Sequence, residues 1–213
     1  MERVNLLEGD IKDHVALGAK GIRDGYVICA PLEHGYVFIA DAFSEFAVRA
    51  MHVLRGDPLF TAAQVIVGSV KTTEGIIREV TPEIKGLMKK FWPGMVSLNL
   101  RPQLGLSWDL GDNNQLDRVS VRLPKAKFAK ALVSQTGPLA IASAARKSMP
   151  APQSLSDVLV LDSDVALKFD NGKLRKGPIS TVIEADETGV RVLRIGAVSL
   201  EEIQAIIPGA TSA

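Results

Sequence analysis

The sequence predicts a single α/β domain built on one mixed parallel and antiparallel sheet that is flanked by helices. Stretches with the two-residue period of strands alternate with stretches that have the 3.6-residue period of helices. No internal repeat, low-complexity tract or linker divides the chain. At 213 residues it is long enough for one core, since a chain of this size buries roughly 70% of its unfolded surface. We expect the domain to span 1–207 and the tail at 208–213 to be flexible.

The first part of the chain predicts two helices and three strands. Apolar residues at three- and four-residue spacing predict a helix over 11–23. Ser44 is a suitable N-cap for a second helix, which Gly56 ends. Short apolar runs predict strands over 26–30, 36–40 and 64–70.

The rest of the chain continues the alternation. Thr81 is a suitable cap for a helix over 81–91, because Pro82 fits its first position. The spacing of Ser199 and Glu202 predicts a capping box and a last helix. Residues 101–118, rich in Gly, Asn and Asp, predict either a hairpin or a flexible loop. The remaining predictions are a helix over 125–135 and strands over 95–100, 118–124, 139–143, 165–169, 179–184 and 190–194.

Composition limits the class of protein. Hydrophobic residues make up 46% and charged residues 23%, and no run of about 18 apolar residues spans a membrane. The acidic N-terminal stretch lacks the apolar region of a signal peptide, so we expect a cytoplasmic protein without a membrane partner. Cys29 is the only cysteine, and His14, His34 and His52 have no metal-type spacing. We therefore expect no disulfide and no protein-held metal.

Charge is distributed unevenly along the chain. Residues 81–147 carry a net charge of +7, whereas residues 1–80 and 148–213 each carry −3. A basic segment between acidic flanks favours a face for phosphate or nucleic acid. Solvated helix faces, such as the one that carries Lys85, Lys89 and Lys90, fit the charge pattern equally well.

Several common catalytic motifs are absent. The sequence has no P-loop, no dinucleotide-binding glycine fingerprint, no nucleophile elbow and no H-E-x-x-H zinc motif. Glu33 and His34 form either an acid/base pair or, as is more frequent, a polar turn. The stretch GPLAIASAARKSMPAP (137–152) is either a strand with a surface loop or a cradle for an anion, because its small residues let a ligand approach the backbone.

Seven stretches in order carry a family likeness. APLEHGYVFIADA (30–42) matches P-T-E-T-V-Y-G-L-x-x-D-A, FWPGMVSLNL (91–100) matches F-W-P-G-P-L-T-L-I-L, and 137–152 matches G-x-P-L-x-x-T-S-A-N-x-S-G-x-P-x-P. The other four lie at 47–58, 119–124, 177–186 and 192–203. Together they resemble the YrdC/YciO family, which includes L-threonylcarbamoyladenylate synthase. The likeness covers roughly residues 14–207.

This resemblance implies a YrdC-like domain with a twisted sheet and a large basic concave surface. The positions that match nucleotide- and phosphate-binding residues are Arg55, Arg122, Ser143, Ser180 and Arg194, with Arg146 and Lys147 as neighbours that add positive charge. The threonine side of the pocket corresponds to Pro31, Leu32, Glu33 and Tyr36. The resemblance implies no covalent nucleophile. Catalysis would rest on positioning and on cationic stabilisation of the triphosphate, with Mg²⁺ carried by ATP.

Some positions depart from the family pattern. Leu32 replaces a threonine, Ala145 replaces the asparagine of S-A-N, and Arg55 and Asp57 replace the lysine and arginine of K-x-R. A charged hydrogen bond contributes roughly 1.5–3 kcal/mol, so loss of the arginine predicts about ten- to a hundredfold weaker ATP binding. Asp57 would also repel a polyphosphate. The H-G-Y at 34–36 resembles the YciO branch, which indicates a diverged paralogue.

Two functions follow from the resemblance. The first is an L-threonylcarbamoyladenylate synthase-type nucleotidyltransferase, which combines ATP, threonine and bicarbonate for tRNA modification. The second is a translation-related module that binds tRNA or double-stranded RNA without catalysis, largely through shape and phosphate contacts. Aromatic residues make up only 5% of the chain, which disfavours recognition of single strands by base stacking. A third reading is an interaction domain whose pocket is vestigial.

Overall fold

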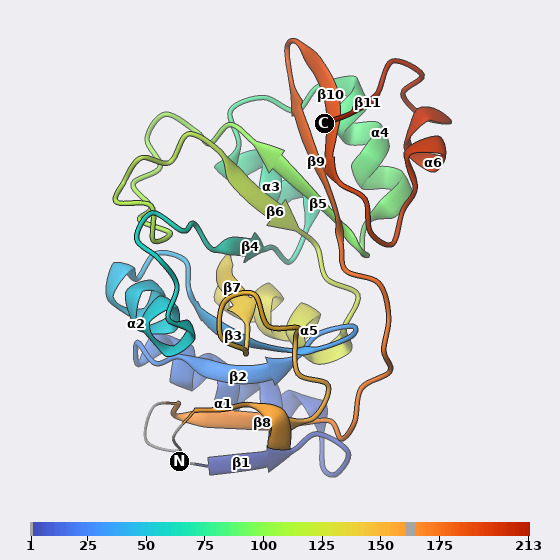
Figure 1. The fold of residues 1–213 in the computed structure, drawn as a ribbon. Coiled ribbons are helices and arrows are strands. Elements are labelled where there is room, and N and C mark those ends of the chain that lie inside the picture. The colour runs from blue at the N-terminus through green and yellow to red at the C-terminus, as the bar shows by residue number, and fades with distance from the viewer. Residues whose placement is uncertain (1, 161–164) are drawn as a thin grey trace.

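The computed structural model describes residues 2–160 and 165–213, which form one mixed sheet with helices on its faces (Figure 1). The strands follow the order β1-β8-β2-β3-β7-β4-β6-β5-β9-β10-β11. Their bounds are β1 Glu2–Asn5, β2 Ile28–Pro31, β3 Tyr36–Asp41, β4 Gln64–Ile66, β5 Val96–Leu100, β6 Val119–Arg122, β7 Leu139–Ser143, β8 Leu167–Asp170, β9 Thr181–Asp186, β10 Gly189–Arg194 and β11 Thr211–Ser212. The predicted α/β class and mixed sheet are confirmed.

The bounds of the helices are α1 Ile11–Arg23, α2 Glu45–Arg55, α3 Val70–Ile76, α4 Pro82–Phe91, α5 Lys127–Thr136 and α6 Leu200–Gln204, with a 3₁₀ turn η1 at Leu155–Asp157. Three of the helices, α2, α4 and α6, begin at the caps that the sequence predicts. The hydroxyls of Ser44, Thr81 and Ser199 each accept a hydrogen bond from a first-turn amide. Gly56 ends α2 with a φ of 63°, a left-handed conformation that glycine adopts without steric cost.

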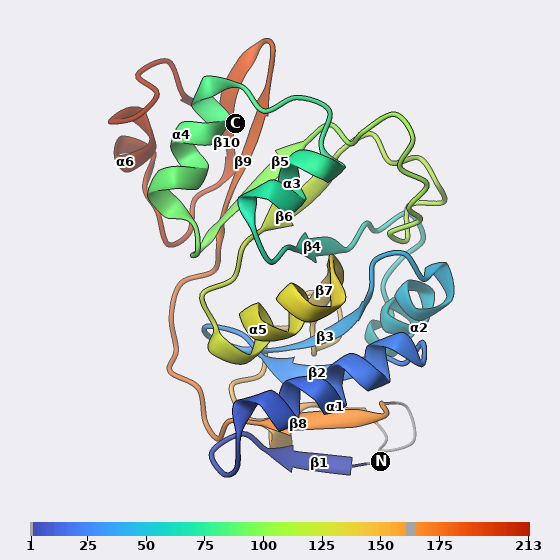
Figure 2. The ribbon, with the colours of Figure 1, turned by 180° about the vertical axis from the view of Figure 1, so that it is seen from behind.

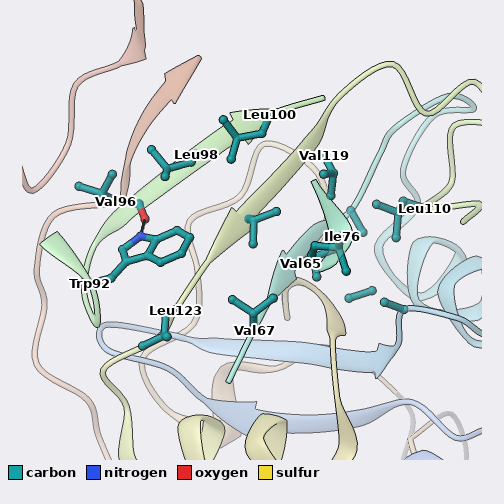
Figure 3. Packing of buried hydrophobic residues seen from close by; sticks show 14 of the residues in the cluster. Val65, Val67, Ile76, Trp92, Val96, Leu98, Leu100, Leu110, Val119 and Leu123 are labelled. Carbon is teal, nitrogen blue, oxygen red and sulfur yellow. Dashed lines mark hydrogen bonds between the residues drawn. The ribbon is translucent and has the colours of Figure 1, made fainter. Parts of the chain in front are cut away.

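The cores lie on the two faces of the sheet. Helices α1 and α5 lie side by side over β2, β3 and β8 (Figure 2). Gly21 allows α1 to approach β8 closely, because a Cβ atom there would lie 2.9 Å from Leu167 Cδ1. A larger cluster packs around β4, β5 and β6, where Trp92 donates a 2.7 Å hydrogen bond from Nε1 to the Val96 carbonyl (Figure 3). Each face of the sheet is thus anchored by its own set of apolar side chains.

Four elements differ from the sequence predictions. The strand predicted over 64–70 ends at Ile66, because the Ser69 hydroxyl accepts from the Thr72 amide and starts α3. The tail predicted to be flexible contains β11, which pairs with β10. Strand β1, which pairs with β8, carries too short a pattern to predict. Residues 101–118 form a packed loop rather than a hairpin, and its Trp108 is buried against Phe43 with ring centroids 5.1 Å apart.

The connection from β8 to β9 links strands that lie near opposite ends of the sheet. Residues 171–180 run from the lower strands to the upper ones along one side of the molecule (Figure 1). The Leu174 amide donates to the Gln153 carbonyl at 2.8 Å, which ties this connection to the loop after β7. A hollow forms between these segments and the sheet. No helix in residues 2–160 and 165–213 is long and apolar enough to cross a membrane.

Candidate functional site

A cavity of about 1000 Å³ lies against β3, β6 and β7. Ligand pockets usually measure roughly 300–1000 Å³, so this one is large enough for a nucleotide. Its walls come from residues distant in sequence, which lie within 32–38, 52–64, 141–160 and 176–180, together with Met95, Arg122 and Arg194. Of the predicted site residues, Leu32, Glu33, Arg55, Arg122, Ser143, Arg146, Ser180 and Arg194 line the cavity. The tertiary structure therefore brings most of the predicted set together.

Arg122 closes one wall of the cavity from the end of β6. Its side chain is 6% exposed, and its Nη1 atom donates to Glu33 Oε2 at 2.9 Å. Glu33 Oε1 accepts from the Lys125 amide at 2.7 Å, so both carboxylate oxygens are used. Burial raises the pKa of Glu33, but the Arg122 charge and the Lys125 amide outweigh it and lower the pKa overall. Glu33 is thus a structural anchor for Arg122, and the alternative of a Glu33–His34 acid/base pair loses support.

Arg194 faces Arg122 from the end of β10. Its Nη2 atom donates to the Ser180 carbonyl at 3.0 Å and to the Ser180 hydroxyl at 3.1 Å. Within the described part of the chain, none of the ion pairs involves Arg194. Burial and the neighbouring Arg122 charge both lower the pKa of Arg194. Arg122 and Arg194 have one carboxylate partner, Glu33, so these three residues leave a net positive charge in the cavity wall.

Three buried polar atoms of the lining residues have no partner in the described part of the chain. They are Arg122 Nε, Ser143 Oγ and Asp57 Oδ1. A buried polar atom without a partner costs about 1–3 kcal/mol. The excess of Arg and Lys over Asp and Glu in the lining, and not these buried atoms, is what fits an anionic ligand. No group of three or more His, Cys, Asp or Glu side chains in 2–160 and 165–213 is arranged to hold a metal.

Arg55 and Asp57, at the end of α2, are paired with each other. Arg55 Nε donates to Asp57 Oδ2 at 2.7 Å, and the Asp57 side chain is 1% exposed. His52 Nδ1 reaches the same oxygen at 2.8 Å. Burial raises the pKa of Asp57, but the hydrogen bonds from Arg55 and His52 outweigh it and lower it overall. The expected repulsion between Asp57 and a polyphosphate is therefore offset by the positive charge of Arg55, which pairs with the Asp57 carboxylate.

Three predicted site residues lie outside the cavity lining. Tyr36 is fully buried, and its hydroxyl donates to the Gly172 carbonyl at 2.8 Å. Pro31 ends β2 behind the wall and Lys147 points to solvent. The Lys147 amide donates to the Arg55 carbonyl at 3.3 Å, so this loop is docked on α2.

His34 is a lining residue that sequence reasoning left open. Its Nδ1 atom lies 3.1 Å from the Arg175 carbonyl, which accepts, so Nδ1 carries the proton. The ring covers Gly177, where a Cβ atom would lie 2.5 Å from three ring atoms. His34 thereby fastens the β2–β3 turn to the connection 171–180. Its position next to Glu33 was the only signal in the sequence.

The comparisons with known proteins agree with this geometry. A family model of the Sua5/YciO/YrdC domain, described as "Telomere recombination", matches residues 20–196. A protein of Mycobacterium tuberculosis named "Putative threonylcarbamoyl-AMP synthase" is 33% identical over 193 residues, which are 90% of this chain and 87% of that protein. Most of each chain is therefore related.

Two solved structures have the same fold. The crystal structure of P. abyssi Sua5 complexed with L-threonine matches with a TM-score of 0.90 at 28% identity. It covers 100% of this chain, which spans only 63% of that one. The crystal structure of E. coli YciO has a TM-score of 0.80 at 19% identity and covers 94% of this chain and 97% of its own, a likeness in fold alone.

Proposed function

The chain belongs to the Sua5/YciO/YrdC family, and from this premise we propose that it synthesises threonylcarbamoyl-AMP from Mg-ATP, threonine and bicarbonate. The observation that carries the proposal is the pair Arg122 and Arg194, with one carboxylate partner, in a cavity of about 1000 Å³. The relative of 33% identity and the threonine complex of P. abyssi Sua5 support the same reaction.

The chemistry that we propose needs positioned charge rather than a nucleophile. Condensation of the threonine amine with bicarbonate releases water and leaves a carbamate. A carbamate oxygen then forms the bond to the α-phosphorus of ATP, and pyrophosphate leaves. Arg122 and Arg194 would offset the negative charge, and the Ser143 and Ser180 hydroxyls would donate to phosphate or ribose oxygens.

Pyrophosphate release tests the proposal. We expect pyrophosphate release to require Mg-ATP, threonine and bicarbonate together. The group that attacks the α-phosphorus of ATP is the carbamate, which forms only from threonine and bicarbonate. A second test is calorimetric titration of Mg-ATP with and without threonine, for which we expect mutually enhanced binding. Release that is independent of threonine, or no binding of Mg-ATP in either titration, would contradict the proposal.

A second candidate is the binding of double-stranded RNA at the mouth of the same cavity. Arg146 and Lys176 line the cavity, and three more exposed basic residues, Lys147, Lys173 and Arg175, lie within three positions of them in the sequence. Phosphate contacts of this kind make affinity fall steeply with salt. We expect RNA binding, if this is the function, to weaken in the Lys173→Glu/Lys176→Glu variant while the salt slope decreases. Binding that is insensitive to both changes would exclude this candidate.

A further inference from the structure

The departures from the family pattern at positions 55, 57 and 145 lie in contact with one another. Arg55 Nε donates to Asp57, and Arg55 Nη1 donates to the carbonyls of both Ser143 and Ala145, the latter at 2.9 Å. The Arg55 side chain is only 13% exposed. Most of the donors of this guanidinium are therefore used inside the protein rather than presented to a ligand.

His52 completes the arrangement from one turn earlier in α2. Its Nδ1 atom faces Asp57 Oδ2 at 2.8 Å, and its Nε2 atom faces the Leu110 carbonyl at 2.9 Å. The ring packs closely on Gly111, where an added Cβ atom would lie 2.4 Å from Nε2. Asp57 is thus held between His52 and Arg55, and its carboxylate is fixed in direction.

We infer that Arg55, Asp57 and Ala145 act as one unit, in which Asp57, held by His52, aims Arg55 at the backbone carbonyls of the turn 143–145. Arg55 is then a positioning residue that fixes this wall of the cavity, not a ligand for the substrate's charge. The consequence for binding rests on the proposed function. The phosphate charge is left to Arg122 and Arg194, while Arg55 and Asp57 order the turn that carries Ser143.

Each member of the unit requires the others. A lysine at position 55 has a single nitrogen and cannot donate in a planar fork to a carboxylate and to two carbonyls. An arginine at position 57 would place a second guanidinium beside Arg55 at a buried site. Position 145 takes part through its backbone carbonyl, which accepts from Arg55. The departures at positions 55 and 57 are therefore one rearrangement and not two separate losses.

Hydrogen exchange of the unliganded protein tests the arrangement without any ligand. We expect peptides that cover 143–149 to exchange at least tenfold faster in Asp57→Asn and in Arg55→Lys than in the wild type. The circular dichroism spectrum should be unchanged. Two variants serve as controls and should leave the exchange unaltered. Glu8→Gln removes an exposed charge just before α1, and Arg23→Lys replaces one exposed cation by another at the end of α1. Equal exchange in the wild type and in both site variants would overturn the inference.

Restoring the family residue gives the opposite test. If Asp57 were a lost ligand position, Asp57→Arg would bind Mg-ATP more tightly than the wild type, and that result would overturn the inference. We expect instead at least tenfold weaker binding, because the new guanidinium displaces Arg55 from the turn. If Asp57→Arg does not fold, Arg55→Lys is used for the binding test. We expect Arg55→Lys to bind Mg-ATP more weakly than the wild type, and unchanged binding would contradict the inference.

The two proposals fail in different ways. A wild-type protein that does not bind Mg-ATP contradicts the proposed function, while the exchange measurement still decides whether Arg55 holds the turn. Normal ATP binding with unchanged exchange in the variants contradicts only the role of Arg55 and Asp57.

Discussion

Arg122 and Glu33 form a buried ion pair whose members remain tied to different elements. Glu33 lies in the β2–β3 turn and Arg122 ends β6, so the pair connects segments 89 residues apart. A buried pair contributes little net stability over an apolar pair, but removal of one member leaves an uncompensated charge. At this scale the pair sets where the Arg122 guanidinium points.

The pH dependence of stability should report Glu33. The pKa of Glu33 is lowered in the folded state. Its contribution to folding stability is therefore fully present above the ordinary Glu pKa of about 4.3 and is lost as pH falls through the folded-state pKa. We expect Glu33→Gln to be less stable at pH 7 by about 1–3 kcal/mol and to lose less stability than the wild type on acidification. Urea denaturation at several pH values between about 3 and 7 measures both. Parallel curves for the two proteins would refute the assignment.

Arg194 should contribute directly to ligand binding. Removal of its charge in Arg194→Gln forfeits a charged contact of roughly 1.5–3 kcal/mol, so we expect about ten- to a hundredfold weaker binding of Mg-ATP. Arg191→Gln is a matched control, because Arg191 lies on the same strand and pairs with Glu184 at the surface. Calorimetric titration compares the variants. Equal losses in both would mean that Arg194 acts only through the stability of β10.

Among the elements, the connection 171–180 contributes a wall of the cavity although it contains no helix or strand. It is held by the Leu174–Gln153 backbone hydrogen bond and by His34, whose ring lies on Gly177. Glycine is needed at position 177 because a side chain would displace the ring. The Tyr36 hydroxyl, which donates to the Gly172 carbonyl, adds a further contact, so several hydrogen bonds place this irregular segment.

A double-mutant cycle checks this contact. We expect Gly177→Ala to destabilise the protein by about 1 kcal/mol, through loss of the His34–Arg175 hydrogen bond. The same change should cost little in a His34→Ala background, because the obstructing ring is gone. Gly105→Ala, at an exposed position with nothing within 4 Å of the added Cβ, is the control. Thermal unfolding gives the energies, and additive effects of His34→Ala and Gly177→Ala would count against the contact.

The cavity depends on the whole fold, because its walls come from both halves of one continuous sheet. Arg122 and Arg194 belong to the upper strands, whereas Glu33 and Ser143 belong to the lower ones (Figure 1). A ligand that contacts both groups stabilises the entire fold. Binding therefore should appear as global stabilisation and not as the ordering of one loop.

A thermal shift measures this coupling. At a ligand concentration of about 100 Kd the stabilisation is about 2.7 kcal/mol, which for a chain of this length corresponds to roughly 5–10 °C in Tm. We expect Mg-ATP with threonine to give such a shift, and a smaller one in Arg194→Gln. A Tm that does not move at saturating concentrations would contradict the proposed site.

Local signals in the sequence determined most of the elements. Ser44, Thr81 and the Ser199–Glu202 capping box mark helix starts that depend only on neighbouring backbone amides. Alternating apolar runs marked the central strands, since side-chain period follows from strand geometry alone. Eight of the predicted site residues line the cavity, but most of its lining residues were not among the predictions. Strands β1 and β11 were missed because β1 has four residues and β11 has two, too few for a readable alternation of apolar side chains.

Only the tertiary structure decided what the site residues do. From the sequence, Arg55 was a candidate ligand, Asp57 a source of repulsion and Tyr36 a pocket residue. In the fold, Arg55 and Asp57 neutralise each other and brace a turn, and Tyr36 is buried behind the wall. The physical reason is that a residue type fixes which hydrogen bonds and charges a side chain has to offer. Which partner receives them depends on segments that meet only when the chain has folded.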